Sequence, residues 1–430
     1  MNGGGIALLR FVLRDINPRR TIVAVIRVSS IFSQMLQLFS RTEFQAAVRE
    51  HKAERHARGF TCWGQFVAML FCQLAGAQSL REICGGLAAS EGKLRHLGLP
   101  DAPRRSTLAY ANEHRPWQLY QSVFYQLLAR SRSIAGPHGF RFKNRLLSLD
   151  ATLIELCASV FDWAQYRRTK GAVKLHLLLD HQGLLPSYAV ITEGRVHESR
   201  IARTLRFEPG TIVVFDRGYN DYAWFDSLDR DGVFFVTRMK ENTDYGVLER
   251  RPVPERGGVQ RDEIIFLYKV AGSGQRDLFL RRIEFWDEEH QRTLVFLTNH
   301  RQFAASTIAR IYKSRWQIEL FFKALKQNLR IKTFVGTTAN ALQTQIWTAL
   351  IAMLLLKYLQ LRSRFGWSLS NLAALLRQQL FVYRNLWLWI DEPFQPPPLL
   401  TAAAQQIPLF PSIHLDSRNA NLIPGTQPSA

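Results

Sequence analysis

The chain has 430 residues, of which 47% are hydrophobic and 12% aromatic, enough for packed cores in two or three domains. Its formal net charge of +21 predicts a polyanionic partner, with nucleic acid the first candidate and an anionic membrane surface the second. Residues 1–145 are the more basic part, with 21 Lys and Arg against 8 Asp and Glu. The four cysteines have no C-x-x-C spacing, which argues against a zinc site or a disulfide framework and fits a reducing cytosol.

Two apolar segments bear on the membrane alternative. The longest apolar run, residues 346–356, is shorter than the ~20 residues needed to cross a bilayer and predicts a buried helix. Residues 6–13 are interrupted by Arg10 and are followed by further arginines without a small-residue cleavage pattern, which argues against a signal peptide. The sequence therefore favours nucleic acid over a membrane as the partner.

The first third of the chain has a helical pattern. Residues 1–29 have no clear periodicity and predict a leader without fixed structure, whereas residues 30–140 predict an all-helical, DNA-binding domain. Ser79 and Ser106 are plausible N-caps within it. The expected helices are residues 31–39, 42–56, 62–75, 80–88, 106–113 and 117–131.

Two of these helices could form a pair similar to a helix-turn-helix. The segments that begin at Ser79 and Arg104 are separated by a turn through Gly98. A helix that begins with Arg104, Arg105 and Ser106 would offer guanidinium groups and backbone N–H groups to DNA phosphates. Simple packing of two helices in a bundle is an equal alternative.

The pattern then changes to strands. Residues 146–154, 172–180 and 185–192 alternate as an antiparallel meander, residues 198–207 predict a helix, and residues 211–216 form an apolar strand that ends in an acid. A strand reached through a helical crossover is expected to run parallel to its neighbour. This order predicts an α/β fold in which residues 141–339 form an RNase H-like catalytic core with a mixed sheet.

The rest of the chain adds to this core. Residues 221–300 contain further strands (233–238, 263–270, 278–286 and 294–298) and predict a β-rich insertion. Residues 340–392 predict C-terminal helices at 341–361 and 369–388, for packing or dimerisation. Residues 393–430 are rich in Pro, Ala and Gln and predict a disordered tail.

Residues 312–326 contain no Gly or Pro and predict a helix with an unusual charged face. At about 100° per residue, one sector of this helix holds Tyr312, Arg315, Glu319 and Lys326. An acid thus lies among groups that bind phosphate. A solvated face with weak ion pairs, such as Glu319 with Lys323, is the alternative.

Three carboxylates can meet in the predicted core. Asp150 lies in its first strand, Asp216 ends the fourth, and Glu319 returns on the charged helix. Such a cluster repels itself unless a divalent cation joins it, and hard oxygen ligands suit Mg²⁺ or Mn²⁺. Two such ions activate a water or hydroxyl and stabilise the leaving oxygen at a phosphodiester. The alternative for each aspartate alone is a turn or cap residue.

These residues resemble a known family. The spacing of Tyr312, Arg315, Glu319 and Lys326 matches the Y-(2)-R-(3)-E-(6)-K signature of DDE transposases from bacterial insertion sequences of the fourth family. Residues 216–219, D-R-G-Y, match the D-x-G-(Y/F) block, and residues 150–152, D-A-T, resemble the first block with Ala151 where Gly is frequent. The resemblance covers residues 30–388.

The resemblance implies a cut-and-paste recombinase that acts as a dimer on paired transposon ends and on target DNA. Asp150, Asp216 and Glu319 would be the metal ligands, and Tyr312, Arg315 and Lys326 would hold phosphates at the cleaved end. Hydrolysis would expose a 3′-hydroxyl, which closes a hairpin on the opposite strand and, after reopening, attacks target DNA. The chain would act on the bacterial nucleoid in the cytoplasm.

Several further residues are weaker candidates. Trp286 and Trp316 could stack on a flipped base, although core packing is the better explanation for each. Arg238 and Lys240 could line the DNA path or form a solvated strand end, and His197 could lie near the metals or cap a helix. Two other functions stay open: a DNA-binding repressor that retains the fold without the activity, and an RNase H-like nuclease without strand transfer.

Overall fold

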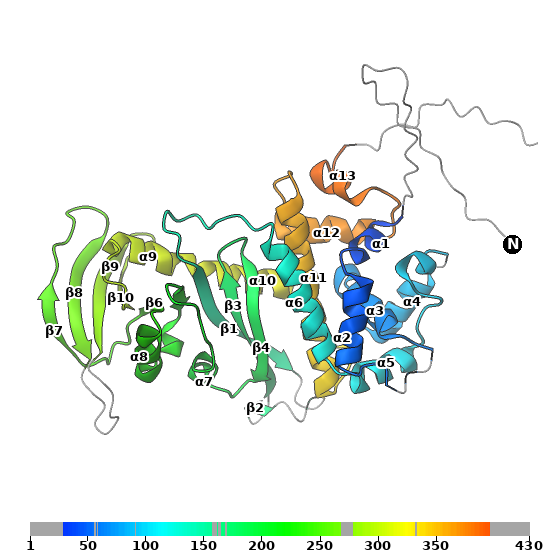
Figure 1. Cartoon of the computed structure of the whole chain (residues 1–430), viewed down its shortest axis with the longest axis horizontal. Helices are drawn as coiled ribbons and strands as arrows, with labels where there is room; N and C mark the ends of the chain where they lie inside the picture. Colours follow the sequence, from blue (N-terminus) through cyan, green and yellow to red (C-terminus); the bar gives the residue numbers. More distant parts are fainter. Residues whose placement is uncertain are drawn as a thin grey trace, which may run out of the picture. The chain divides into compact units, whose positions relative to one another are not determined.

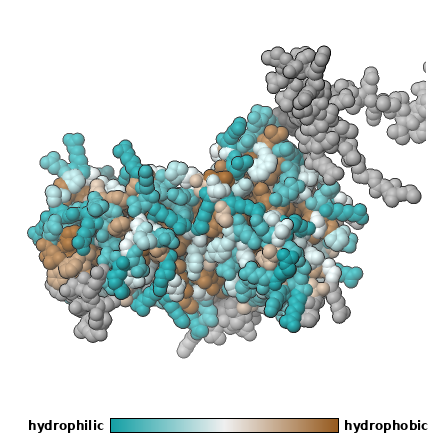
Figure 2. Space-filling view, viewed as in Figure 1, coloured by the Kyte–Doolittle hydropathy of each residue, from teal (hydrophilic) through white to brown (hydrophobic). Residues whose placement is uncertain are grey.

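The computed structural model describes residues 29–395 apart from residues 56, 58, 91, 157–160, 162–164, 168–169, 268–277 and 332. Residues 29–393 form one compact unit, in which a large sheet lies beside a body of helices (Figure 1). The predicted leader and tail lie outside the described residues, except for residue 29 and residues 393–395. Hydrophilic residues dominate the face of this unit seen in Figure 2, with hydrophobic residues in smaller patches.

The N-terminal helices begin where a side chain can accept a hydrogen bond from the first turn. Ser40, Thr61 and Ser79 each cap a helix in this way, and Ser79 is therefore an N-cap as predicted. The helices are α1 (Ile31–Leu36), α2 (Arg41–Glu50), α3 (Cys62–Ala75), α4 (Leu80–Ala88), α5 (Arg105–His114) and α6 (Gln118–Arg132), with a 3₁₀ turn η1 (Leu94–Leu97).

Three predicted helix boundaries in this region are wrong. The helix expected at residues 31–39 ends at Leu36. Ser106 is not an N-cap, because the carbonyl of Arg104 already accepts the N–H of Leu108 and α5 begins one residue before Ser106. The helix expected at residues 42–56 ends at Glu50, and Lys52 then takes a positive φ of 50°. A left-handed backbone at a non-glycine residue ends regular helix geometry.

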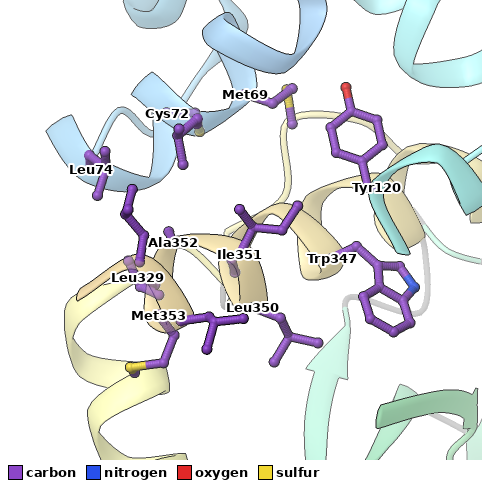
Figure 3. Close-up of a cluster of buried hydrophobic side chains, with 14 of the residues drawn as sticks. Met69, Cys72, Leu74, Tyr120, Leu329, Trp347, Leu350, Ile351, Ala352 and Met353 are labelled. Carbon is purple, nitrogen blue, oxygen red and sulfur yellow. The ribbon is translucent and has the colours of Figure 1, made fainter. Parts of the chain in front are cut away.

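The helix α11 (Ala339–Arg362) organises the helical body. It packs against α3 through Met69, Cys72 and Leu74, and against α6 through Tyr120 (Figure 3). By length and composition α11 could cross a membrane, but 83% of its apolar window is buried inside the protein. It is a core helix, as predicted for residues 346–356.

The helices before and after the sheet share one core. Buried residues of α1–α6 and of α11, α12 (Leu369–Gln379) and α13 (Leu386–Asp391) belong to the same hydrophobic cluster. The helix predicted at residues 369–388 is two helices, because the chain turns after α12 and Asn385 caps α13 by accepting the N–H of Leu388. Residues 30–140 and 340–392 thus form one helical body and not two separately packed parts.

The sheet has the strand order predicted for the core. β1 is antiparallel to β3 and β3 to β4, whereas β5 is parallel to β1 and β6 is parallel to β5. This is an RNase H-like arrangement in a mixed α/β fold. The strands are β1 (Leu146–Leu156), β2 (Gln165–Arg167), β3 (Lys170–Asp180), β4 (Leu185–Glu193), β5 (Ile212–Phe215), β6 (Phe234–Arg238), β7 (Tyr245–Arg250), β8 (Val259–Leu267), β9 (Phe279–Asp287) and β10 (Arg292–Thr298).

Strands β7–β10 extend the same sheet. β10 pairs with β6, and β9, β8 and β7 follow in order to the edge. The expected insertion at residues 221–300 is therefore too wide at its start, because α8 (Tyr222–Arg230) and β6 come before β7 and β6 pairs with β5. The edge strand β7 exposes Val247 and Leu248, and Figure 2 shows a hydrophobic patch at this end of the molecule.

Helices cover both faces of the core strands. Leu149 and Leu178 pack into the cluster that contains α8. Leu175 and Leu177 pack into the cluster that contains α10 (Trp316–Asn328) and α11. Because side chains alternate between the faces of a strand, each face of the sheet has its own buried core.

Candidate active site

Strand pairing brings the two aspartates together. In the parallel register of β1 and β5, Leu149 lies beside Phe215. Asp150 and Asp216 directly follow these two residues, so the aspartates are neighbours too. β5 is buried throughout and ends at Phe215, which leaves Asp216 at its carboxyl end. Asp150 lies opposite Leu177 of β3 and therefore on the face of the sheet that α10 covers.

Arg315 joins two of the acids. Its Nη1 donates to Oδ2 of Asp150 at 3.1 Å, and its Nη2 donates to Oε1 of Glu319 at 2.6 Å. The side chains of Arg315 and Asp150 are only 14% and 19% exposed, so both charges are largely removed from water. The Nε of Arg315 is buried without a hydrogen-bond partner among the described residues.

The helix that carries these groups is interrupted at Arg315. The sequence predicts one continuous helix, but α9 (Ala305–Ser314) ends before Arg315 and α10 begins after it. The N–H of Arg315 bonds to the carbonyl of Tyr312, and the N–H of Ile318 bonds to the carbonyl of Arg315. These i to i+3 bonds tighten the turn locally, and Arg315 and Glu319 still form an i, i+4 ion pair.

Tyr312 completes the cluster on the side of the second aspartate. Its hydroxyl lies 3.5 Å from Oδ1 of Asp216, at the long limit of a hydrogen bond. The ring is buried and packs on Phe296 with centroids 5.0 Å apart. Burial raises the pKa of Tyr312 and the nearby Asp216 adds to this, so the phenol stays protonated and remains a donor.

The electrostatics favour a divalent cation at this point. Burial, with smaller contributions from Glu319 and Asp216, raises the pKa of Asp150 to about 6, although Arg315 and the N–H of Ala151 oppose the shift. One guanidinium is thus the counter-charge for three carboxylates. Carboxylate oxygens from two strands and a helix are the hard donor set that Mg²⁺ or Mn²⁺ takes, so the residues present fit a metal.

The raised pKa predicts a pH-dependent stability. Between the unfolded pKa and the folded pKa of Asp150 the folded state binds more protons, so the free energy of unfolding falls as pH rises through this window. In EDTA, stability relative to Asp150→Asn should therefore fall by about 3 kcal/mol between roughly pH 4 and pH 7. Urea unfolding of both proteins across this range measures the effect. A difference that is constant with pH would contradict the raised pKa.

A second polar cluster lies on the other face of β3, and sequence reasoning missed it. Lys174 is buried, and its Nζ donates to Oε1 of Glu198 and to the carbonyl of Val196, both at 2.8 Å. The signal was a lysine and a histidine, two residues apart, within a strand that is mainly apolar. Burial lowers the pKa of the neighbouring His176 to about 4, with help from Lys174, so its imidazole is neutral.

Tyr219, from the turn η2 (Arg217–Tyr219) after Asp216, is fully enclosed. Its hydroxyl has no hydrogen-bond partner among the described residues. Burial raises its pKa strongly, and Asp150, Glu198 and Asp216 add to the shift. The phenol is therefore a neutral, buried donor close to the acids.

Tyr219→Phe is expected to leave the free energy of unfolding unchanged or to raise it by about 1 kcal/mol, because an unsatisfied buried hydroxyl is removed and the ring is kept. Tyr219→Ala should instead cost roughly 3–5 kcal/mol, because the buried ring is lost. Thermal and urea unfolding compare the two. A loss in Tyr219→Phe as large as that in Tyr219→Ala would show that the hydroxyl is bonded.

The remaining predicted residues lie at different distances from the acids. Lys326 is half-buried on α10, about two turns after Glu319. Arg238 ends β6 close enough to influence Tyr312, and the exposed Lys240 donates to the carbonyl of Asn220. His197 is the N-cap of α7 (Glu198–Ala202), as the capping alternative predicts; α7 is shorter than the helix expected at residues 198–207.

The two tryptophans and the two N-terminal arginines have different surroundings. Trp316 is 56% exposed at the start of α10, so the core-packing explanation is wrong for this residue. Trp286 is half-buried in β9, opposite Thr293 of β10. Arg104 and Arg105 are exposed at the start of α5, as a DNA contact would require, but nothing lies against them that identifies a ligand.

Comparisons with known proteins identify the family. Residues 141–355 match the family described as Transposase DDE domain, and residues 27–100 match a domain of unknown function (DUF4372). A protein of Sinorhizobium fredii that is named as a transposase, y4zB, is 30% identical over 71% of this chain and 85% of its own length. A protein of Geobacillus stearothermophilus, named as a transposase for insertion sequence element IS5377, is 30% identical over 55% and 63%.

A solved structure of the piggyBac transposase synaptic complex with hairpin DNA also matches. It covers 87% of this chain and 83% of its own, with 9% identity and a TM-score of 0.44. The family match spans the strands and helices that carry Asp150, Asp216 and Glu319. The chain belongs to the DDE transposase family of bacterial insertion sequences and is an enzyme that cleaves DNA and transfers strands.

Proposed function

We propose that Asp150, Asp216 and Glu319 are the metal ligands of this transposase and that they hold two Mg²⁺ or Mn²⁺ ions. The observation that carries the proposal is the double ion pair of Arg315 with Asp150 and Glu319, next to Asp216. The ion pair holds carboxylates from β1 and α10 on one guanidinium, and Tyr312 contacts the third carboxylate at the end of β5. Bound metal would activate a water or 3′-hydroxyl and stabilise the leaving oxygen.

Arg315 has a second role in this proposal. If Asp150 and Glu319 hold a divalent cation, the Arg315 guanidinium would be released from them and would be available to a phosphate. Tyr312 donates a phenol hydrogen from the other side of the site, and Lys326 adds a point charge further along α10. These three groups would hold the cut DNA end while its hydroxyl is aligned for attack.

The remaining contacts follow from exposure and charge. The exposed Trp316 is the better candidate to stack on a flipped base in a hairpin intermediate, and the half-buried Trp286 is the second. Arg238 and Lys240 would line the DNA path. The helices of residues 30–140, with Arg104 and Arg105 exposed, would bind the terminal inverted repeats of the element in a homodimer that acts on the bacterial nucleoid.

The experiment is a strand-transfer assay with purified protein, Mg²⁺ and a duplex from the end of the element that encodes this chain. We expect nicked, hairpin and joined products, each absent in EDTA. Nicked product without joining would favour an RNase H-like nuclease. Binding without any cleavage would favour a repressor with the same fold. Either result would overturn the proposed reaction.

A further inference from the structure

An open groove of about 520 Å³ lies among the N-terminal helices, away from the three acids in sequence. One wall is a stripe of α2 that bears Arg41, Thr42, Gln45 and Arg49, residues that share a helix face at spacings of three and four. Trp63 of α3 forms part of the opposite wall. The lining residues all fall within the match to the domain of unknown function.

Arg41 is held in a defined position. Its guanidinium lies over the ring of Trp63, 3.7 Å from the centroid. Trp63 is itself 7% exposed, and its Nε1 donates to the carbonyl of Leu97 at 2.8 Å. Gly98, beside the Arg41 guanidinium, has a φ of +77°, a backbone conformation that favours glycine.

The positive charges of the groove have no ion-pair partners within the described part of the chain. Neither Arg41 nor Arg49 has a carboxylate within ion-pair distance among the described residues. Glu54 also lines the groove, but its Oε1 accepts the N–H of Cys62 at the start of α3, where a helix N-terminus stabilises an anion. Partial burial lowers the pKa of Arg41, as expected for a guanidinium without a bound anion.

We propose that this groove binds the sugar-phosphate backbone of the DNA on which the transposase acts, an inference that rests on the proposed function. Arg41 and Arg49 are eight residues apart on α2, about 12 Å along the helix, and would each bind one phosphate. Thr42 and Gln45 lie between them and can donate to backbone oxygens. Trp63, with its ring against the Arg41 guanidinium, keeps that group in place.

DNA is the ligand that these observations favour over a free phosphate. Two separated guanidiniums suit a polyanion better than one small ion, and the groove is open to solvent. The net charge of +21 also requires a large anionic partner. The groove would add a contact to DNA beyond the one expected at Arg104 and Arg105.

The test is the salt dependence of DNA binding, measured by fluorescence anisotropy in EDTA so that no cleavage occurs. Probes are a duplex from the end of the element, a duplex of unrelated sequence, and inorganic phosphate as a competitor. Arg41→Ala and Arg49→Ala should each lower the slope of log K against log salt by about one, and the double variant by about two. The loss should be similar for both duplexes, because backbone contacts carry no sequence information.

Two further variants keep the test specific. Arg364→Ala removes one exposed charge from the segment after α11, in the same helical body but outside residues 30–140 and outside the groove, and it should leave the slope unchanged. Gln45→Glu places an anion four residues from both Arg41 and Arg49, so it should weaken DNA binding while stabilising α2 slightly. Circular dichroism confirms that each variant is folded.

The outcomes separate this inference from the proposed function. Equal slopes for wild type, Arg41→Ala and Arg49→Ala would contradict DNA binding in the groove, as would a loss of slope in Arg364→Ala equal to that in Arg41→Ala. Competition by millimolar inorganic phosphate without any change of slope would show a small-anion site only. Failure of the proposed function would instead be seen as absent cleavage and joining by the wild-type protein in Mg²⁺.

Discussion

Replacing any one of Asp150, Asp216 and Glu319 with its amide is expected to slow DNA cleavage and strand joining by roughly a thousandfold or more. Each amide keeps the size of the side chain but removes the charge that would hold a divalent cation. Because Arg315 pairs with both Asp150 and Glu319, losing either acid also frees a guanidinium. The measurement is the initial rate of product formation at saturating Mg²⁺ and DNA.

Asp101→Asn is the matched control. Asp101 is exposed in the helical body, and the same change of charge there should leave the rate within about twofold, because an isolated surface charge contributes little. DNA affinity in EDTA should persist in all three amide variants, since the groove and the basic helices are untouched. Strand joining at the wild-type rate by any of the three amide variants would show that the replaced acid is not part of the active site.

Arg281→Met is expected to lower the free energy of unfolding by roughly 3–5 kcal/mol, because it strands a buried carboxylate. Arg281 and Asp262 form a bidentate pair at 2.8 and 2.6 Å between β9 and β8, with side chains 3% and 7% exposed. Nη1 of Arg281 also donates to the carbonyl of Phe303, just before α9. The pair therefore links the added strands to the helix that leads into the active site.

The double variant Arg281→Met with Asp262→Leu should recover most of this loss, because no unpaired charge remains. Lys313→Met breaks an exposed pair with Glu289 and should have no measurable effect on unfolding. Urea unfolding of the wild type, Arg281→Met, the double variant and Lys313→Met measures the loss of stability and its recovery. A double variant as unstable as Arg281→Met would mean that lost packing, and not the stranded charge, destabilises the protein.

The acids and strand order of the core could be predicted from sequence because both depend on local patterns. Alternating apolar residues predicted β1, β3 and β4, and the crossover rule predicted that β5 would be parallel to β1. Parallel pairing then brings the ends of two neighbouring strands together. This is why the order of strands in the sequence predicts that Asp150 and Asp216 lie close to each other.

Other features depend on contacts between distant segments, which the sequence does not encode locally. α8 was not predicted, although Asp221 caps it and Trp224, Phe225 and Leu228 follow a helical spacing; the β-rich surroundings hid this short pattern. The contact of the Arg315 guanidinium with Asp150 joins residues that are 165 apart in the chain. The shared core of the first and last helices likewise depends on contacts between distant segments, such as that of Phe32 with Phe381.

The central claim is that three carboxylates from β1, the end of β5 and α10 form one metal site. Calorimetric titration of Mn²⁺ into the DNA-free protein tests it most directly. We expect saturable binding at pH 8 that weakens below about pH 6, where Asp150 becomes protonated, and that is lost in Asp150→Asn, Asp216→Asn and Glu319→Gln but kept in Asp101→Asn. The same Mn²⁺ isotherm in the wild type and in the three amide variants would contradict the claim.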